Sequence, residues 1–136
     1  MPCRACSPLW IFSSMLLLAV AGCGGDSLAR GSVRGKVTLE GKPIAEGTII
    51  FTPTDGTTGP MAMAQIVNGE YSIQQDAPVV GVHAVKIQGF RDTNKKDQLG
   101  RAIGEQFVPA KYNERTTLKV EIAKGANACD FPLTLQ

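Results

Sequence analysis

Apolar and polar residues alternate through most of the chain, and this alternation restricts the fold more than any other feature of the sequence. In its first run, Val33, Gly35 and Val37 take every second position, with Arg34 and Lys36 between them. Successive side chains of a β-strand point to opposite faces, so a period of two is typical of a strand with one buried face. Similar runs recur to the end of the chain, separated by Gly, Pro and Asn, without the period of an amphipathic helix. The pattern predicts an all-β domain.

The sharpest turn signal is the dipeptide Asn68-Gly69, which stands between two of these runs. A two-residue type I′ turn needs positive φ at both central residues, and Asn and Gly adopt that conformation most easily. The predicted hairpin has three cross-strand pairs: Val67 with Glu70, Ile66 with Tyr71, and Ala64 with Ile73. Ile66 and Tyr71 would then face the core, and Val67 the outside.

Further alternating segments predict the remaining strands: Thr48–Thr52, Val82–Gln88, Leu118–Ile122 and Cys129–Leu135. The inward set of the second of these can begin at Val82 or at His83, and the positions of Val85 and Ile87 favour His83. The residues that we expect in the core between two sheets include Phe51, Tyr71, Val120 and Phe131.

Two segments lack the alternation. Gly89–Gln106 is polar and longer than a usual connection, which predicts an irregular loop. Lys124–Asn127 predicts a turn between the last two strands. About seven short strands at this spacing indicate a β-sandwich.

Leu18-Ala19-Val20-Ala21-Gly22-Cys23 closes an apolar run that begins at Leu9, and it resembles the lipobox of bacterial lipoproteins. The resemblance implies that Cys23 becomes the mature N-terminus and carries the lipid. A transmembrane anchor is the competing interpretation, but the run is shorter than the roughly 20 residues that a span needs. The predicted organisation is a lipoprotein signal peptide (1–22), a lipidated tether (23–31) and one β domain (32–136).

Several stretches resemble carboxypeptidase regulatory-like domains. Val33–Ile44 is similar to the family's opening G-x-V-x-x-x-G-x-P-[LI], and Gly47–Phe51 and Asn68–Ile73 are similar to its next two strands. The end of the chain, Pro109–Asn113 through Leu118–Ile122 to Cys129–Leu133, is similar to a group of small bacterial lipoproteins built from this domain. The resemblance implies a seven-stranded Greek-key β-sandwich of the transthyretin (prealbumin) type. Its motifs are structural, so it bears on fold more than on function.

Candidates for catalysis are few. His83 is the single histidine, and its place in an alternating strand favours a half-buried structural residue over a general base. Cys129 alternates with apolar residues in the same way, which favours a small core residue over a nucleophile. Cys3 and Cys6 form a CxxC, but they fall in the predicted signal peptide, and the acidic residues lack the spacing of a calcium loop. We expect no enzyme, no cofactor and no metal site; hydroxyisourate hydrolase, a transthyretin-like enzyme that relies on several histidines, is a remote alternative.

Charge and exposure shape the expected function. The chain has 14 Lys+Arg against 12 Asp+Glu, for a net charge of +2, and no basic run that would attract nucleic acid. Any specific contact is expected in Gly89–Tyr112, the longest interruption of the strand pattern. Its candidate binding residues are Phe90, Arg91, Lys95, Lys96, Arg101 and Tyr112. The predicted function is a lipid-anchored, non-catalytic binding or structural module of the bacterial cell envelope, facing away from the cytoplasm. Its partners would be the membrane, through the lipid, and an envelope protein or glycan; the alternative is a domain with a specific glycan or peptide ligand.

Overall fold

The structure is a computed structural model that describes residues 28–136, and the predicted lipid attachment site Cys23 lies outside these residues. The strands, in chain order, are β1 (Gly31–Leu39), β2 (Lys42–Pro43), β3 (Glu46–Pro53), β4 (Ala62–Val67), β5 (Glu70–Ile73), β6 (Gly81–Lys96), β7 (Ala102–Gln106), β8 (Lys119–Ile122), β9 (Gly125–Ala128) and β10 (Phe131–Leu133). The described part of the chain has no α-helix, only the short 3₁₀ helix η1 (Ala110–Tyr112). The prediction of an all-β domain is confirmed.

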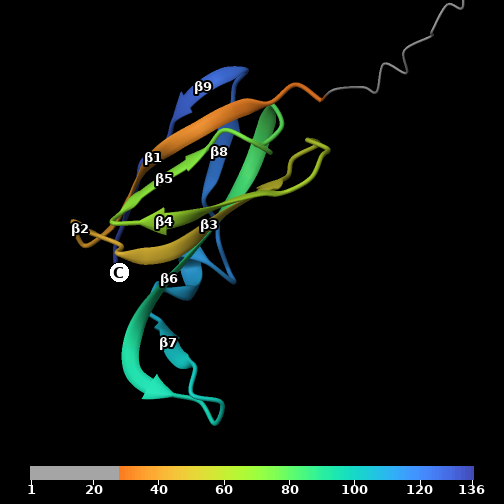
Figure 1. Cartoon of the computed structure of the whole chain (residues 1–136). Helices are drawn as coiled ribbons and strands as arrows, with labels where there is room; N and C mark the ends of the chain where they lie inside the picture. The colour runs from red at the N-terminus through yellow and green to blue at the C-terminus, as the bar shows by residue number, and fades with distance from the viewer. Residues whose placement is uncertain (1–27) are drawn as a thin grey trace, which may run out of the picture.

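The ten strands are joined in the order β10-β1-β5-β4-β3-β6-β7 (Figure 1). Three strands lie off this path, since β8 pairs with β6 while β2 and β9 pair with β1. Most pairs are antiparallel, but β9 and β10 both run parallel to β1. The count exceeds the predicted seven because β7 forms in a segment that was expected to be a loop, β9 forms in an expected turn, and the two-residue β2 also pairs with β1.

The hairpin at Asn68-Gly69 forms as expected at its turn and differs beyond it. Asn68 and Gly69 have φ of 51° and 78°, and Val67 pairs with Glu70. This is the one pair that β4 and β5 share: β5 continues along β1, while β4 continues along β3. The predicted pairs Ile66–Tyr71 and Ala64–Ile73 are therefore wrong, although Ile66 and Tyr71 do face the core. Tertiary pairing with β1 separates the two arms of a hairpin that local turn chemistry begins.

Gly69 is required by its surroundings as well as by its φ. A Cβ at this position would lie 2.4 Å from Cβ of Pro43, closer than side chains can approach. The turn is fastened there by backbone bonds, because the Gly69 amide donates to the Ile44 carbonyl at 2.7 Å and the Asn68 amide donates to the Ala45 carbonyl at 2.9 Å. The β4–β5 turn thus packs directly on the connection between β1 and β3.

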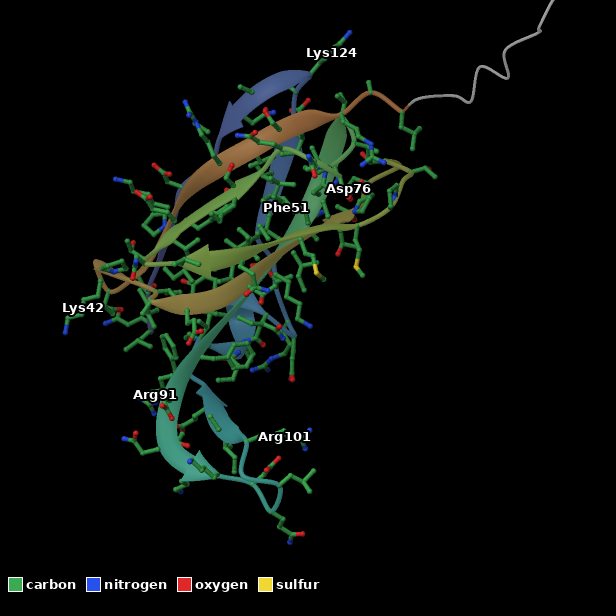
Figure 2. The ribbon with its side chains drawn as sticks, viewed as in Figure 1. Lys42, Phe51, Asp76, Arg91, Arg101 and Lys124 are labelled. Carbon is green, nitrogen blue, oxygen red and sulfur yellow. The ribbon has the colours of Figure 1, made fainter. Side chains whose placement is uncertain are left out.

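The core is one cluster of buried side chains to which strands from β10 through to β6 and β8 contribute, and to which β7 does not. Phe51 of β3 lies 6.1 Å, centroid to centroid, from Tyr71 of β5, and Tyr71 lies 6.3 Å from Phe131 of β10. Figure 2 shows Phe51 inside the body of the molecule. His83, Val85 and Ile87 point inward, as the alternation predicted, and all three are fully buried. Val120 is only half-buried, because it lies on β8 at the edge of β6.

Strand β6 continues well past the point where the alternation ends. It pairs with β3 up to Gly89 and then with β7, from the pair Phe90–Gln106 to the pair Lys96–Ala102. The expectation of an irregular loop over Gly89–Gln106 is wrong, since most of this segment is a two-stranded ribbon. Neither face of this ribbon is buried, so its sequence lacks the alternation of apolar and polar residues from which a strand is predicted.

The predicted turn at Lys124–Asn127 is also replaced by a strand. Residues Gly125–Ala128 form β9, which runs along β1 from Gly31 to Arg34. The Asn127 side chain holds this arrangement, because its amide donates to the Ala123 carbonyl at 2.8 Å and to the Ser32 carbonyl at 3.1 Å. Asn127, a residue type typical of turns, thus links β9 to β1.

Candidate functional site

The most exposed element of the described chain is the ribbon, by which we mean Phe90–Gln106. It extends away from the body of the molecule, at the end opposite to residue 28 (Figure 1). Within it only Thr93 and Asp97 are partly covered, and every other residue is exposed. A β-bulge between Asp92 and Lys95, with Asn94 at φ 55°, bends the strand.

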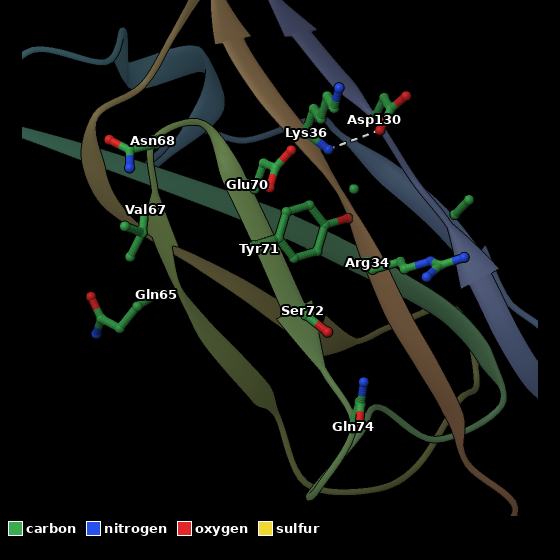
Figure 3. Close-up of a pocket in the computed structure, with 12 residues that line it drawn as sticks. Arg34, Lys36, Gln65, Val67, Asn68, Glu70, Tyr71, Ser72, Gln74 and Asp130 are labelled. Carbon is green, nitrogen blue, oxygen red and sulfur yellow. Dashed lines mark hydrogen bonds between the residues drawn. The ribbon is translucent and has the colours of Figure 1, made fainter.

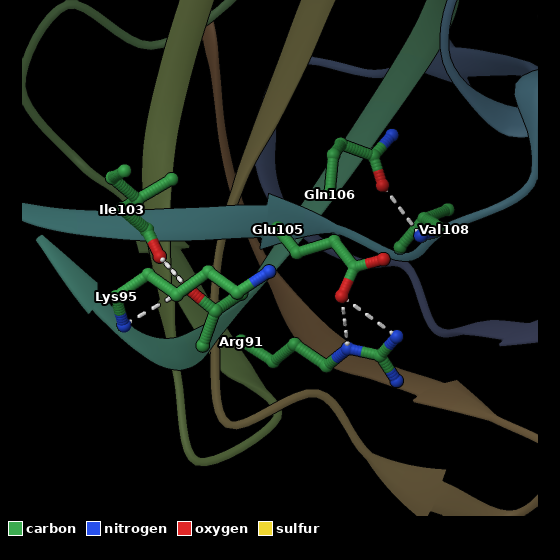
Figure 4. A network of polar contacts seen from close by, with 7 residues as sticks. Arg91, Lys95, Ile103, Glu105, Gln106 and Val108 are labelled. Carbon is green, nitrogen blue, oxygen red and sulfur yellow. Dashed lines mark hydrogen bonds and ion pairs between the residues drawn. The ribbon is translucent and has the colours of Figure 1, made fainter. Parts of the chain in front are cut away.

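Ion pairs and side-chain turns stabilise the ribbon along its length. Near the base, the Arg91 guanidinium donates to one oxygen of Glu105 from Nε at 3.0 Å and from Nη2 at 2.9 Å (Figure 4). At the tip, the Asp97 carboxylate accepts the Leu99 and Arg101 amides and pairs with the Arg101 side chain at 2.7 Å. The hydrogen bonds from Arg101, with that from Leu99, hold the pKa of Asp97 below its usual value. The Asp97–Gly100 turn was a signal in the sequence that could have predicted the hairpin.

Five of the six candidate binding residues lie on this ribbon. Phe90 and Arg91 are at its base, where they line an open groove of ≈ 350 Å³ with Phe107 and the β2 residue Lys42. Lys95 and Lys96 lie at the far end of β6, and Arg101 follows the tip (Figure 2). The residues are therefore distributed along one element and do not converge on a pocket.

Tyr112 lies apart from the other candidates, in η1. Its hydroxyl accepts a hydrogen bond from the Thr134 amide at 3.1 Å and is 3.3 Å from the Thr134 hydroxyl. These bonds lower the pKa of Tyr112. Tyr112 attaches the C-terminal residues to the domain and partly packs against the core.

Apolar side chains accompany the charges of the ribbon. Phe90 is 39% exposed, Ile103 42% and Leu99 76%. The ribbon therefore presents apolar side chains to solvent at its base, along β7 and at its tip.

A second hollow, which sequence reasoning missed, lies on the outer face of β1 and β5, beside the turn of β4 (Figure 3). It is an open groove of ≈ 790 Å³, and its polar lining includes Arg34, Lys36, Gln65, Glu70, Ser72 and Gln74. These residues are spaced by two along their strands, so the groove is the solvent-facing counterpart of the buried alternation. Its concavity comes from the divergence of β4 and β5, which no local signal predicts.

Two hydrogen bonds hold residues that line this groove in place. The Tyr71 hydroxyl donates to the Cys129 carbonyl at 2.6 Å, and burial raises the pKa of Tyr71 far above its usual value. The Lys36 amide donates to the Asp130 carboxylate at 2.8 Å. The aromatic ring of Tyr71 is buried, so the groove offers polar groups and no aromatic stacking surface.

His83 and Cys129 have structural surroundings. His83 was expected to be half-buried and is fully buried, because β3 and β8 flank its strand on both sides. Nδ1 is 3.2 Å from the Gly81 carbonyl, to which it must donate, and the buried Nε2 has no partner among the described residues. The Cys129 thiol is half-covered, and burial, with the nearby charge of Asp130, raises its pKa.

Within residues 28–136, no group of three or more His, Cys, Asp or Glu side chains is arranged to hold a metal ion. In the same residues no helix is long and apolar enough to cross a membrane. Comparison of the chain with protein-family models and with curated proteins finds no match to either.

Proposed function

We propose that this chain is a lipid-anchored, non-catalytic module of the bacterial cell envelope. Its lipid is carried by Cys23, and it contacts its partner through the ribbon. The single observation that carries the proposal is the ribbon itself: a two-stranded element that projects from the body with exposed Phe90, Leu99 and Ile103 among charged side chains. Binding residues are commonly displayed on such exposed elements, which a rigid scaffold positions.

The scaffold in this proposal is a transthyretin-like β-sandwich. In this proposal β10, β1 and β5 form one layer and β4, β3, β6 and β8 form the other, and together they are the seven strands that the family resemblance implies. Each layer follows the order of neighbouring strands, β10-β1-β5 and β4-β3-β6 with β8 on β6. The separation of β4 and β5 after one shared pair supports two layers, as does the single core cluster to which both groups contribute. In this arrangement β1 and β3, which follow one another in the chain apart from the two-residue β2, lie in different layers.

The proposal that the module is non-catalytic rests on the positions of its reactive side chains. A general base needs to reach a substrate, and His83 is fully buried with Nδ1 occupied by the Gly81 carbonyl. A nucleophilic thiol needs a lowered pKa, whereas that of Cys129 is raised. The hydroxyisourate hydrolase alternative requires several histidines, and the chain has one.

The experiment is capture of envelope components by the full-length protein in intact cells, with chemical crosslinking. Replacing Asn94–Gly104 by a short Gly/Ser linker should abolish capture and leave folding unchanged, because loop closure depends weakly on length. Ser in place of Met61 and Met63, exposed on and beside β4, is the matched control and should capture normally. Capture that survives the ribbon replacement contradicts the assignment of the contact.

The anchor is tested separately by mass spectrometry of the purified protein. An acyl-bearing N-terminal Cys23 is expected, and Cys23→Ser should leave an unprocessed, unlipidated precursor. A mature N-terminus elsewhere, or Cys23 without acyl mass, contradicts the anchor.

A second candidate function is specific binding of a glycan or peptide in the groove over β1 and β5. The observation that favours it is the concave row of amide, hydroxyl and charged side chains, with Ser72 near its middle. Ser72→Leu should then abolish binding to a glycan or peptide array while ribbon-dependent capture continues. An array that shows equal binding by Ser72→Leu and the unchanged protein contradicts this candidate.

A further inference from the structure

The ribbon ends in an open strand edge. Strand β7 pairs with β6 alone and is the last strand of the sheet. Its five residues are all exposed. An isolated two-stranded ribbon is marginally stable in water, and an uncovered edge is a template for pairing with a further strand.

The phase of the ladder shows which groups of β7 face outward. The Phe107 amide donates to the Gly89 carbonyl at 3.1 Å, so these opposite residues are a hydrogen-bonded pair. Such pairs alternate along antiparallel strands, so Glu105, opposite Arg91, also bonds toward β6. The amides and carbonyls of Gly104 and Gln106 therefore point away from β6. On the far side of the bulge, the Ile103 carbonyl accepts the Thr93 hydroxyl at 2.6 Å and so also faces β6.

We propose that a second copy of this chain covers this edge, through antiparallel pairing of β7 with the partner's β7 about a two-fold axis at Ile103. This inference rests on the proposed function, because it names a second copy as what the ribbon contacts. In this register Gly104 lies opposite the partner's Ala102. The backbone groups of these two residues point outward from their own ribbons, so they form a hydrogen-bonded pair between the copies.

The charges of the ribbon select this register over its neighbours. Residues 101, 103 and 105 share one face of the strand. Centring on Ile103 puts Arg101 opposite the partner's Glu105, twice by symmetry, with the two isoleucines between them. Centring on Glu105 would oppose two carboxylates, and centring on Gly104 would oppose Ile103 and the partner's Glu105.

The intramolecular ion pairs extend into this interface. Arg101 already pairs with Asp97 at 2.7 Å, and Glu105 with Arg91 at 2.9 Å. A carboxylate accepts several hydrogen bonds and a guanidinium donates five, so each can hold a second partner. The result is two symmetric networks of four charges that flank a buried pair of isoleucines. Because the ribbon projects from the body (Figure 1), its edge is clear of the core strands.

The test is a charge exchange in the full-length protein, purified from membranes in detergent and sized by sedimentation. Arg101→Glu gives carboxylates at both positions, and Glu105→Arg gives two guanidinium groups, so each variant alone should dimerise about tenfold more weakly or worse. An equal mixture should recover the dimer, since each unlike pair restores both attractions. Met63→Ser, a change of an exposed residue on β4 outside the ribbon, is the control and should dimerise normally.

Three outcomes overturn the inference: a monomeric unchanged protein at micromolar concentration, single variants that dimerise normally, or a mixture that stays monomeric. Circular dichroism of each variant establishes that the domain is folded. The register is tested independently with Ile103→Cys in a Cys129→Ser background. This variant should form a disulfide between copies, because the Cα atoms of directly opposed residues are as close as a disulfide requires. No disulfide at this position also overturns the register. A monomer whose ribbon still captures an envelope component overturns the dimer alone, whereas ribbon-independent capture overturns the proposed function.

Discussion

The two halves of β6 belong to one strand and follow different physical rules. Residues 81–84 pair with β8 and residues 83–89 with β3, and every second side chain from His83 to Ile87 is fully buried. Beyond residue 89 the strand pairs only with β7, and its side chains face solvent on both sides. The first half is stabilised by burial and the second by cross-strand pairs, two ion pairs and a side-chain turn. A change of similar size should therefore have large effects in the body and small effects in the ribbon.

The largest expected effect is truncation of Phe131, which is 9% exposed and packs on Tyr71. Phe131→Ala should lower the free energy of unfolding by about 3–5 kcal/mol, the usual cost of removing a buried aromatic ring. Ile103→Ala on the ribbon, where the side chain is 42% exposed, should cost less than about 1 kcal/mol. Urea denaturation of both variants measures the difference, and equal losses would contradict the comparison.

A smaller difference in stability is expected between alanine substitutions at two glycines with the same φ. Gly69 in the body and Gly100 in the ribbon both have φ 78°, but a Cβ meets Pro43 at the first and nothing within 4 Å at the second. Gly100→Ala should cost about 1 kcal/mol, the left-handed penalty alone. Gly69→Ala should cost about 2–3 kcal/mol, because the clash adds to that penalty. Thermal unfolding checks both, and a Gly69→Ala variant as stable as Gly100→Ala would show that the turn does not pack on Pro43.

The smallest effects concern pH, and the two regions should respond at opposite ends of the scale. Burial and the charge of Asp130 raise the pKa of Cys129 above 9.0, so the unfolded thiol ionises first. The contribution of this group is complete below that value and is lost as pH rises through it. Cys129→Ser should reduce the alkaline loss of stability, and an unchanged profile from pH 8 to 10 would contradict this.

At the ribbon tip the sign is reversed. Hydrogen bonds from Arg101 and Leu99 lower the pKa of Asp97 below 3.8, so the charged form stabilises the turn above that value. Protonation as pH falls should open the turn. The Leu99 and Arg101 amides should then lose protection, measured as their hydrogen-exchange rate relative to the unstructured peptide at the same pH, while body amides stay protected. Asp97→Asn is the control and should remove the pH dependence of this protection. Protection of the two amides that does not change with pH in the unchanged protein would contradict the prediction.

Much of the body could be predicted from its sequence because burial acts there on alternate residues. The inward positions of Phe51, Tyr71 and Phe131 are confirmed, as is the turn at Asn68-Gly69. The ribbon could not be predicted in this way, since a strand exposed on both faces leaves no period in hydropathy. The candidate residues on the ribbon were predicted from their expected exposure. Their arrangement along one element, and their separation from Tyr112, follow from the pairing of β6 with β7.

Local chemistry, written in the sequence, determined which residues face inward and where tight turns begin. Only the tertiary structure decided which strands meet. Strand β5 leaves β4 after one pair to follow β1, and Gly125–Ala128 joins β1 although Lys124–Asn127 carries turn residues. The groove over β1 and β5 is a consequence of those pairings. The physical reason is that side-chain periodicity and turn conformation are properties of neighbouring residues, whereas backbone hydrogen bonds between distant strands are selected by the burial that the whole domain achieves.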